Sequence, residues 1–312
     1  MEHPKKWSVR TLGRLFGVGV FMGSADLVPG VSGGTIALIC GIYERLLQSI
    51  AVVTGDALKA LVQGRVREAY ELVPVSFLVP LGGGILAALV VLAHLLSWLL
   101  VAYPVYLWSF FFGLILASTY VVLTRTTLRT VPTASGLLLG CALGYGVVGL
   151  IPMETPHTWW MVSLSGAIAI SAMILPGISG SFILLILGQY QYILAAVTHA
   201  RMDVLAVFAA GCALGLAVFS RVLSWLLSQY HNVTLAVLAG IMLGSLRKVW
   251  PWKDVQRAHV PGAGTEPILI ETNMLPAHTD HTVFVACVLC LLGIAVVLSI
   301  HIRQTKRATT TA

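Results

Sequence analysis

The chain contains the stretch SADLVPGVSGGTIALICGIY at residues 24–43 and, 147 positions later, the similar stretch SAMILPGISGSFILLILGQY at residues 171–190. Eleven of the twenty positions are identical, and the pattern Pro-Gly-x-Ser-Gly falls at the same place in both. Shared hydrophobicity alone does not produce so many identities. The two stretches are therefore predicted to be copies of one structural unit.

A second match follows each copy. The sequence LSWLL occurs at residues 96–100 and again at residues 223–227, a shift of 127 positions. Gly113 and Gly240 are separated by the same 127 positions. This shift is 20 positions smaller because the polar stretch after Gln48 has no counterpart of equal length after Ala195. Each copy is predicted to contain a Pro-Gly-x-Ser-Gly segment followed by two membrane spans.

The composition places the chain in a lipid bilayer. Of its 312 residues 58% are hydrophobic and 10% are charged, and the mean hydropathy is +0.91, whereas soluble domains have about 25% charged residues. A helix of about 20 apolar residues crosses a bilayer. Runs of that kind predict six spans, at residues 75–101, 105–123, 133–151, 204–227, 233–250 and 282–302.

The apolar arms around the Pro-Gly-x-Ser-Gly segments are short. As a helix, the 16 residues from Leu12 to Leu27 reach about 24 Å against a hydrocarbon core of about 30 Å. Both ends of this first unit are basic, which predicts a re-entrant hairpin or two short tilted spans. Three spans then follow, so the second hairpin is entered from the opposite face. The predicted fold is an all-α polytopic membrane protein with an inverted repeat, the plan of many secondary transporters.

The predicted organisation follows from these segments. It is a first repeat at 1–130 (re-entrant hairpin 12–50, spans 75–101 and 105–123), a connecting span at 131–152, a second, inverted repeat at 153–252 (re-entrant hairpin 159–197, spans 204–227 and 233–250), an external loop at 253–280 and a C-terminal span with a cytoplasmic tail at 281–312. The external loop contains no motif that predicts a chemical function.

The basic residues predict the orientation. Thirteen Lys and Arg residues fall on one face of this plan and five on the other, with Arg221 inside a span. The positive-inside rule makes the richer face cytoplasmic, so both termini are expected in the cytoplasm of a cell whose inner membrane holds the protein. We expect no cleaved signal peptide, because no small-residue cleavage site follows Arg10 and Arg14. The net charge of +7 reports orientation rather than nucleic-acid binding.

The two helix breaks are predicted to bind phosphate. Proline and glycine interrupt each helix, and the helix that restarts presents unpaired N–H groups, the positive end of its dipole and serine hydroxyls. An arginine inside a span can grip phosphate with two hydrogen bonds, although it can also snorkel to the interface. The plain alternative for the breaks is tight tips that pack helices together. The predicted phosphate-binding set is Gly30, Ser32, Gly33, Gly34, Thr35, Gly177, Ser179, Gly180, Ser181 and Arg221.

Six further residues are predicted to couple or gate transport: Asp26, Glu44, Arg45, His94, Gln189 and Tyr190. Asp26 could exchange a proton or cation, orient the tips or cap a neighbouring group, since charges inside lipid are candidates for function. His94 matches Arg221 under the shift of 127 and could gain charge near neutral pH, or be a core histidine. Glu44 and Arg45 would line the cytoplasmic mouth, and Gln189 and Tyr190 would contact cargo outside. Interfacial anchoring is the alternative for these four.

The five cysteines all lie in apolar runs. We expect small buried hydrophobic residues there, without disulfides or zinc ligation, and we expect no metal or other cofactor.

Residues 23–45, GSADLVPGVSGGTIALICGIYER, and residues 175–181, LPGISGS, resemble the PopT family of bacterial polyprenyl-phosphate transporters, and the resemblance extends over nearly the whole chain. It implies a flippase, not an enzyme, that moves undecaprenyl phosphate or a related polyprenyl phosphate from the outer to the cytoplasmic leaflet. Such movement recycles the lipid carrier for peptidoglycan and other envelope polymers. Membrane lipid would be the surrounding partner, and coupling to a proton or cation stays open. Ser24 departs from the small residue, such as alanine, that the family pattern suggests there.

Two other functions fit part of the pattern. A small-anion or ion carrier would share the inverted repeat and the anion-binding tips. A membrane lipid phosphatase would need a nucleophile with acid–base partners or a metal cluster, and the apolar runs contain no cluster of His, Asp or Glu. A structural scaffold is disfavoured, because buried charges and broken helices cost free energy without a use.

Overall fold

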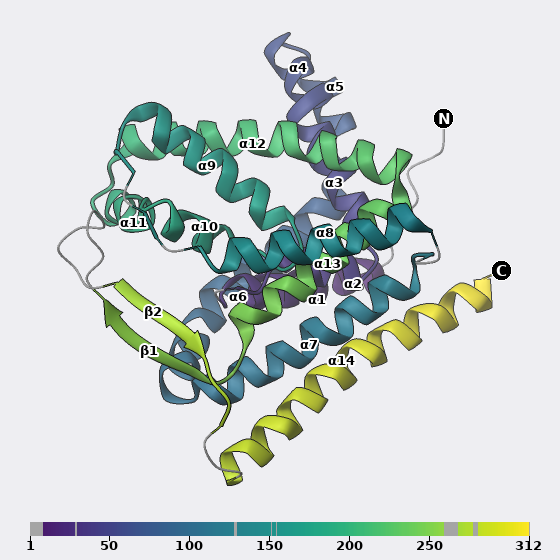
Figure 1. Cartoon of the computed structure of the whole chain (residues 1–312). Helices are drawn as coiled ribbons and strands as arrows, with labels where there is room; N and C mark the ends of the chain where they lie inside the picture. The colour runs from purple at the N-terminus through teal and green to yellow at the C-terminus, as the bar shows by residue number, and fades with distance from the viewer. Residues whose placement is uncertain are drawn as a thin grey trace.

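The structure, a computed structural model, describes residues 9–28, 30–127, 130–150, 152, 153, 155–258, 268–276 and 280–311 (Figure 1). Side chains are described except at residues 255–258, 268–270 and 304–311. Pro29 of the first helix break lies outside the described residues.

Helices dominate both halves of the chain. The first half contains α1 (Val9–Asp26), α2 (Gly33–Ile39), α3 (Tyr43–Val52), the π-helical turn η1 (Val53–Ala57), α4 (Leu58–Val62), α5 (Val66–Leu72), α6 (Val75–Ala102), α7 (Pro104–Thr124) and α8 (Val131–Val148). The second half contains α9 (Trp159–Ile174), α10 (Gly180–Ile186), α11 (Tyr190–Thr198), α12 (Met202–Gln229), α13 (His231–Val249), β1 (Lys253–Ala258), β2 (Ile268–Asn273) and α14 (His281–Thr311).

Six of the described helices are long and apolar enough to cross a membrane: α6, α7, α8, α12, α13 and α14. They fall at the six predicted spans, with ends that differ by a few residues, so the chain is a multi-pass helical membrane protein. The shorter helices after each Pro-Gly-x-Ser-Gly segment are sharply bent. The bend is 118° between α2 and residues Tyr43–Val62, and 112° between α10 and α11.

The same helix contacts occur twice. Gly19 of α1 packs against the carbonyl of Leu81 on α6, and Gly166 of α9 packs against the carbonyl of Phe208 on α12. The glycines are related by the shift of 147 and their partners by the shift of 127. A Cβ at either glycine would clash with backbone, so small residues allow these helices to approach closely.

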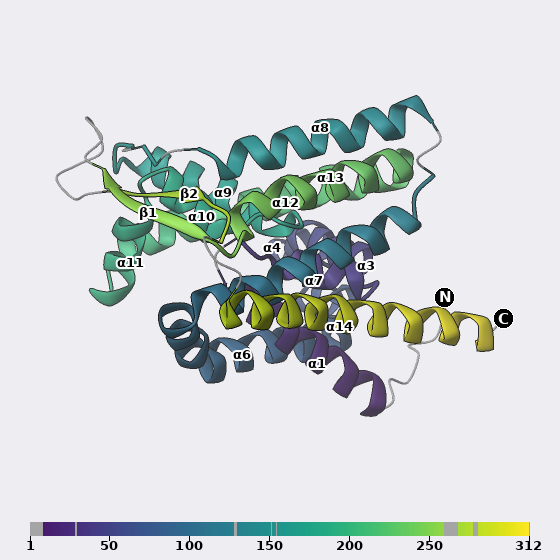
Figure 2. The same cartoon turned by 60° about the horizontal axis from the view of Figure 1, so that its bottom comes forward.

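The connecting span α8 and the C-terminal span α14 are also matched. Gly113 of α7 packs against Cys290 of α14, and Gly240 of α13 packs against Leu137 of α8. Each of α8 and α14 thus lies along the central helix of the other half (Figure 2). We predicted them as a connecting span and a C-terminal span outside the repeat, and the structure gives them matching neighbours.

The prediction of a helical fold is confirmed, and one short segment of the described residues forms strands instead. Strands β1 and β2 pair antiparallel, with Lys253 opposite Asn273, inside the stretch predicted to be a loop without chemistry. The Nδ2 of Asn273 donates to the carbonyl of Arg247 at 2.8 Å, and the Nε1 of Trp250 donates to that of Met274 at 2.8 Å. These bonds attach the hairpin to the end of α13. In sequence these two six-residue stretches resemble an ordinary polar loop.

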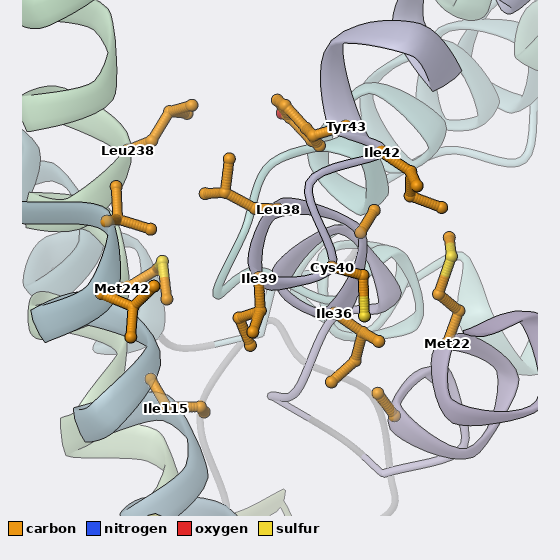
Figure 3. Close-up of a cluster of buried hydrophobic side chains, with 14 of the residues drawn as sticks. Met22, Ile36, Leu38, Ile39, Cys40, Ile42, Tyr43, Ile115, Leu238 and Met242 are labelled. Carbon is orange, nitrogen blue, oxygen red and sulfur yellow. The ribbon is translucent and has the colours of Figure 1, made fainter. Parts of the chain in front are cut away.

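The core surrounds α2. This short helix is buried along its whole length and lies between Leu238, Met242 and Ile115 on one side and Met22 on the other (Figure 3). Helices α7 and α13 are the most buried of the six long helices. We call the end of the molecule that holds β1–β2 the hairpin end, and the opposite end, where α7 stops and α13 begins, the Arg125 end (Figures 1 and 2).

Candidate functional site

Both predicted helix breaks are present. Gly30 and Gly177 have φ of 84° and 89°, in the left-handed region that favours glycine. Two residues later, Ser32 and Ser179 occupy the N-cap positions of α2 and α10. The breaks therefore place two short helices, each with its N-terminus inside the molecule.

The two tips touch each other. The Ser32 hydroxyl donates to the carbonyl of Met173 at 3.0 Å, and the N–H of Gly177 donates to Oγ1 of Thr35 at 3.1 Å. Beneath them the Tyr43 hydroxyl donates to the carbonyl of Ile174 at 3.1 Å. Ser32, Thr35 and Tyr43 are all buried, so these bonds form the junction between the two halves.

The first tip does not offer the unpaired N–H groups that we expected. Oδ1 of Asp26 accepts from the N–H of Gly33 at 2.7 Å, and the Ser32 hydroxyl accepts from the N–H of Gly34 at 3.1 Å. The N–H of Thr35 donates to the carbonyl of Ser32 at 3.0 Å. Asp26 thus occupies the place where an external anion would bind, which matches the capping role among its three predicted roles.

The second tip differs from the first. Met173 stands where the first tip has Asp26, and the hydroxyls of Ser179 and Ser181 bond each other at 2.8 Å. Within the described residues, the N–H groups of Gly180 and Ser181 have no hydrogen-bond acceptor. Only this tip retains the donors that the sequence suggested.

Two predicted cations lie away from the tips. The Arg221 guanidinium on α12 donates from Nη2 to the carbonyl of Thr54 at 3.2 Å and rests against Gly55 in the π-helical turn. His94 has an exposed side chain on α6. The shift of 127 relates these two positions, but the structure brings neither of them to Ser32 or Ser179.

Gln189 has a structural role. Its side chain is fully buried, and its Nε2 donates to Oγ1 of Thr155 at 2.7 Å while its Oε1 lies 3.2 Å from Nδ1 of His157. These bonds fix the chain before α9. Tyr190, the next residue, is 37% exposed.

A polar cavity of about 440 Å³ opens at the Arg125 end. It brings together the predicted Glu44 and Arg45 with three residues that the sequence did not single out, Gln48, Arg125 and His231. The other lining residues are Leu38, Gly41, Tyr43, Val122 and Leu235. Tyr43 also bonds the tip junction, so the cavity reaches inward to the point where the two halves meet.

The cavity carries a positive balance. Its lining residues include two arginines, Arg45 and Arg125, and one carboxylate, Glu44, whose Oε1 lies 3.8 Å from Nδ1 of His231. The Arg45 guanidinium also lies 4.5 Å from the centre of the Phe77 ring, a contact that orients it. Helix α3 begins at Tyr43 on the cavity wall, so the positive end of its dipole faces the same space. Such a cavity suits an anion.

The described residues contain no cluster of three or more His, Cys, Asp or Glu that could hold a metal ion. All five cysteines are free. Only Cys40 is buried, whereas Cys287 on α14 is exposed, so the prediction that all five are buried was wrong.

Comparison with known proteins gives the family. A family model described as undecaprenyl phosphate translocase-like matches residues 22–266. A polyprenyl-phosphate transporter of Vibrio cholerae is 43% identical over 289 residues, which cover 91% of this chain and 94% of the relative. A polyprenyl-phosphate transporter of Staphylococcus aureus is 31% identical over 252 residues, which cover 75% of this chain and 84% of the relative. No solved structure matches the chain. Because the family model matches well over half of the chain and both relatives align over most of their length, this protein belongs to the undecaprenyl phosphate translocase-like family.

Proposed function

We propose that the protein moves undecaprenyl phosphate, or a related polyprenyl phosphate, from the outer to the cytoplasmic leaflet of a bacterial cytoplasmic membrane. The observation that carries this proposal is the cavity in which Arg45 and Arg125 meet beside the joined tips. The names of the two relatives support the choice of cargo. Return of the carrier lipid would supply the synthesis of cell-envelope polymers.

In this proposal the two halves are inverted repeats, each with a re-entrant hairpin. The nearly equal bends after the two breaks and the duplicated glycine contacts support a common unit. The excess of Lys and Arg at the Arg125 end supports a cytoplasmic location for that end and for both termini. The hairpin end then faces outward, and the cavity belongs to a state open toward the cytoplasm.

The cavity would hold the head group by charge. A phosphate monoester carries about −1.5 to −2 charges at neutral pH, and two guanidinium groups can each offer it a pair of parallel hydrogen bonds. Gln48 and His231 add further donors on the cavity wall. When the head group enters the cavity, hydrogen bonds from these donors replace its bonds to water. These bonds compensate the free-energy cost of removing the phosphate from water.

The prenyl tail would stay in hydrocarbon. A second cavity of about 220 Å³ lies between α1, α2, α7 and α14 and is lined by apolar side chains such as Phe21, Ile39 and Val297. Ile39 and Cys40 of its wall are sequence neighbours of Leu38 and Gly41 in the polar cavity. The end of α2 thus separates the polar cavity, which would hold the phosphate, from the apolar cavity, which would hold isoprene units of the tail.

Passage requires the tip junction to open. Separation of Ser32 from Met173 and of Thr35 from Gly177 would free the donors of both tips. The phosphate would then pass Gly33, Gly34, Gly180 and Ser181, provided that Asp26 leaves the N–H of Gly33. A proton or cation taken up by Asp26 would weaken its hydrogen bond from the N–H of Gly33. In this proposal Asp26, rather than the exposed His94, couples transport to the proton or cation.

The test uses purified protein in liposomes with labelled undecaprenyl phosphate, with and without a pH gradient. We expect movement between leaflets that depends on the prenyl tail and leaves the phosphate ester intact. Equal transport of a short-chain phosphate or of inorganic phosphate would favour a small-anion carrier. Release of phosphate from the lipid would favour a phosphatase, and no movement at all would refute the proposal.

A further inference from the structure

Two lysines and one carboxylate form a partly buried cluster at the hairpin end. Oε2 of Glu271 on β2 accepts from Nζ of Lys248 at 3.0 Å and from Nζ of Lys253 at 2.7 Å. The side chains of Lys253 and Lys248 are only 9% and 19% exposed, and that of Glu271 is 34% exposed. Ion pairs on a protein surface are usually far more open than this.

The cluster joins elements of both halves. The Lys253 ammonium lies 4.6 Å from the centre of the Trp108 ring on α7, and that of Lys248 lies 4.9 Å from the Phe182 ring on α10. The stem of Lys248 presses on Gly30, since a Cβ there would lie 3.0 Å from Cγ of Lys248. Lys248 therefore lies against the first tip, and its bond to Glu271 links it to Lys253.

The cluster is not electrically balanced. Burial raises the pKa of Glu271. The positive charges of Lys248 and Lys253 lower it by more than burial raises it, so the pKa lies below its usual value. Burial also lowers the pKa of Lys253, against the opposing effect of Glu271. One carboxylate serves two ammonium groups, and a group with nearly two negative charges would match them better.

The repeat relates this cluster to the cavity at the Arg125 end. The shift of 127 carries Arg125 onto Trp252, the residue before Lys253, and carries Trp108 onto Leu235 of the cavity wall. Trp108 is the ring beneath Lys253. The cluster thus lies where an equivalent cavity would open on the other side of the membrane, and both places contain two cationic side chains.

We propose that Lys248 and Lys253 form the site that binds the phosphate monoester in the state open toward the hairpin end, and that Glu271 occupies this site as an internal stand-in for phosphate in the present state. An arriving head group displaces Glu271, the β hairpin moves aside, and Lys248 releases Gly30. The inference rests on the proposed function, because it names a second contact for the same cargo.

A competing view is that the three charges only hold the hairpin in place. The two views predict opposite effects for Glu271→Gln. If Glu271 competes with cargo, its neutralisation frees two lysines and strengthens capture. If it only anchors the hairpin, its neutralisation leaves capture unchanged or weakens it.

The test measures the initial rate of movement against the amount of labelled undecaprenyl phosphate in the hairpin-side leaflet of oriented proteoliposomes. For Glu271→Gln we expect the half-saturating amount to fall severalfold, and for Lys248→Met with Lys253→Met we expect it to rise about tenfold or more, since charge-assisted hydrogen bonds are lost. The matched control is Glu71→Gln, which removes one partner of the exposed Arg67–Glu71 pair at 3.1 Å on α5. Unchanged half-saturation in both cluster variants, or weaker capture in Glu271→Gln, would overturn the inference.

A binding measurement separates this inference from the proposed function. Farnesyl phosphate is titrated onto the protein in nanodiscs, in a background of Arg45→Gln and Arg125→Gln that removes the charges of the other cavity. When Glu271→Gln is added to this background, we expect the protein to bind farnesyl phosphate more tightly. When Lys248→Met and Lys253→Met are added instead, we expect binding to be lost. Equal affinities would refute the lysine site whether or not the wild-type protein moves lipid. A wild-type protein that moves no lipid while Glu271→Gln binds more tightly would refute the proposed function alone.

Discussion

At the scale of the residue, the tips depend on backbone conformations that only glycine adopts easily. Gly177 has φ of 89°, and a Cβ there would lie 2.7 Å from Oγ of Ser245. We expect Gly177→Ala to lower the free energy of unfolding by about 1–3 kcal/mol. The control is Gly17→Ala, because Gly17 lies in α1 with nothing within 4 Å of its Cβ position, and helix propensity there favours alanine by up to about 1 kcal/mol. Denaturant titration that shows equal stability for the two variants would contradict the tip geometry.

Asp26 gives a second test at this scale. Asp26→Asn keeps an oxygen that accepts from the N–H of Gly33 but removes the charge. We expect a loss of stability of about 1 kcal/mol or less, together with loss of any stimulation of lipid uptake by a pH gradient. Ser24→Ala, two residues earlier on the same helix, is the control. Uptake by Asp26→Asn that responds to the gradient as the wild type does would remove Asp26 from coupling.

The sequence predicted which residues break the helices, because Pro-Gly-x-Ser-Gly determines conformation locally. It did not predict which groups satisfy the freed donors. Gly33 bonds a carboxylate seven positions away, whereas Ser32 bonds a carbonyl 141 positions away. Arg125 and His231 enter the cavity only because α7 and α13 lie together, and no local pattern marks such a pair.

At the scale of the element, close helix packing through glycine is the recurring device. In α13, a Cβ at Gly240 would clash with the carbonyl of Leu137 on α8. Gly240→Ala should therefore separate α8 from α13 and reduce stability by about 1–3 kcal/mol through overpacking. Gly146→Ala on α8 has nothing within 4 Å and serves as the control. Thermal unfolding in detergent measures both, and an equal midpoint would show that this contact contributes nothing.

The β hairpin gives a prediction about pH. The pKa of Glu271 is raised by burial but lowered more by Lys248 and Lys253, so it lies below the usual value of 4.5. A carboxyl with a lowered pKa stabilises the folded state above its unfolded pKa, and this contribution is lost as the pH falls through the lowered value. Amide exchange at Thr272, corrected for its intrinsic pH dependence, should stay protected down to about pH 5 and increase only in stronger acid. Glu271→Gln should remove this dependence, and deprotection well above pH 5 would contradict the ion cluster.

Elements were predictable to different degrees. The six long spans followed from apolar length, because lipid imposes that length on every crossing helix. The partners of α8 and α14 did not follow, since no sequence pattern assigned neighbours to the connecting and C-terminal spans, and glycine contacts between distant segments determine them. The hairpin β1–β2 escaped notice because its stability depends on bonds to Arg247 and Trp250 at the end of α13.

At the scale of the whole molecule, the two ends differ although both halves contain a helix break and matching glycine contacts. The Arg125 end contains an open cavity with two guanidinium groups. The corresponding place at the hairpin end contains Lys253 packed over Trp108 and bonded to Glu271. The shifts of 147 and 127 predicted the common unit from the sequence, whereas the difference between the ends arises from the hairpin, which has no counterpart among the described residues of the first half.

The most direct measurement is the initial rate of movement of labelled undecaprenyl phosphate in proteoliposomes containing Arg45→Gln and Arg125→Gln. We predict a rate at least about tenfold below that of the wild type, because each lost guanidinium removes charge-assisted bonds to phosphate, with partial recovery in Arg45→Lys and Arg125→Lys, which keep the charge but not the paired donors. The control is Arg67→Gln on the exposed face of α5, which should move lipid at the wild-type rate. A double glutamine variant that folds normally and moves the lipid as fast as this control would contradict the account.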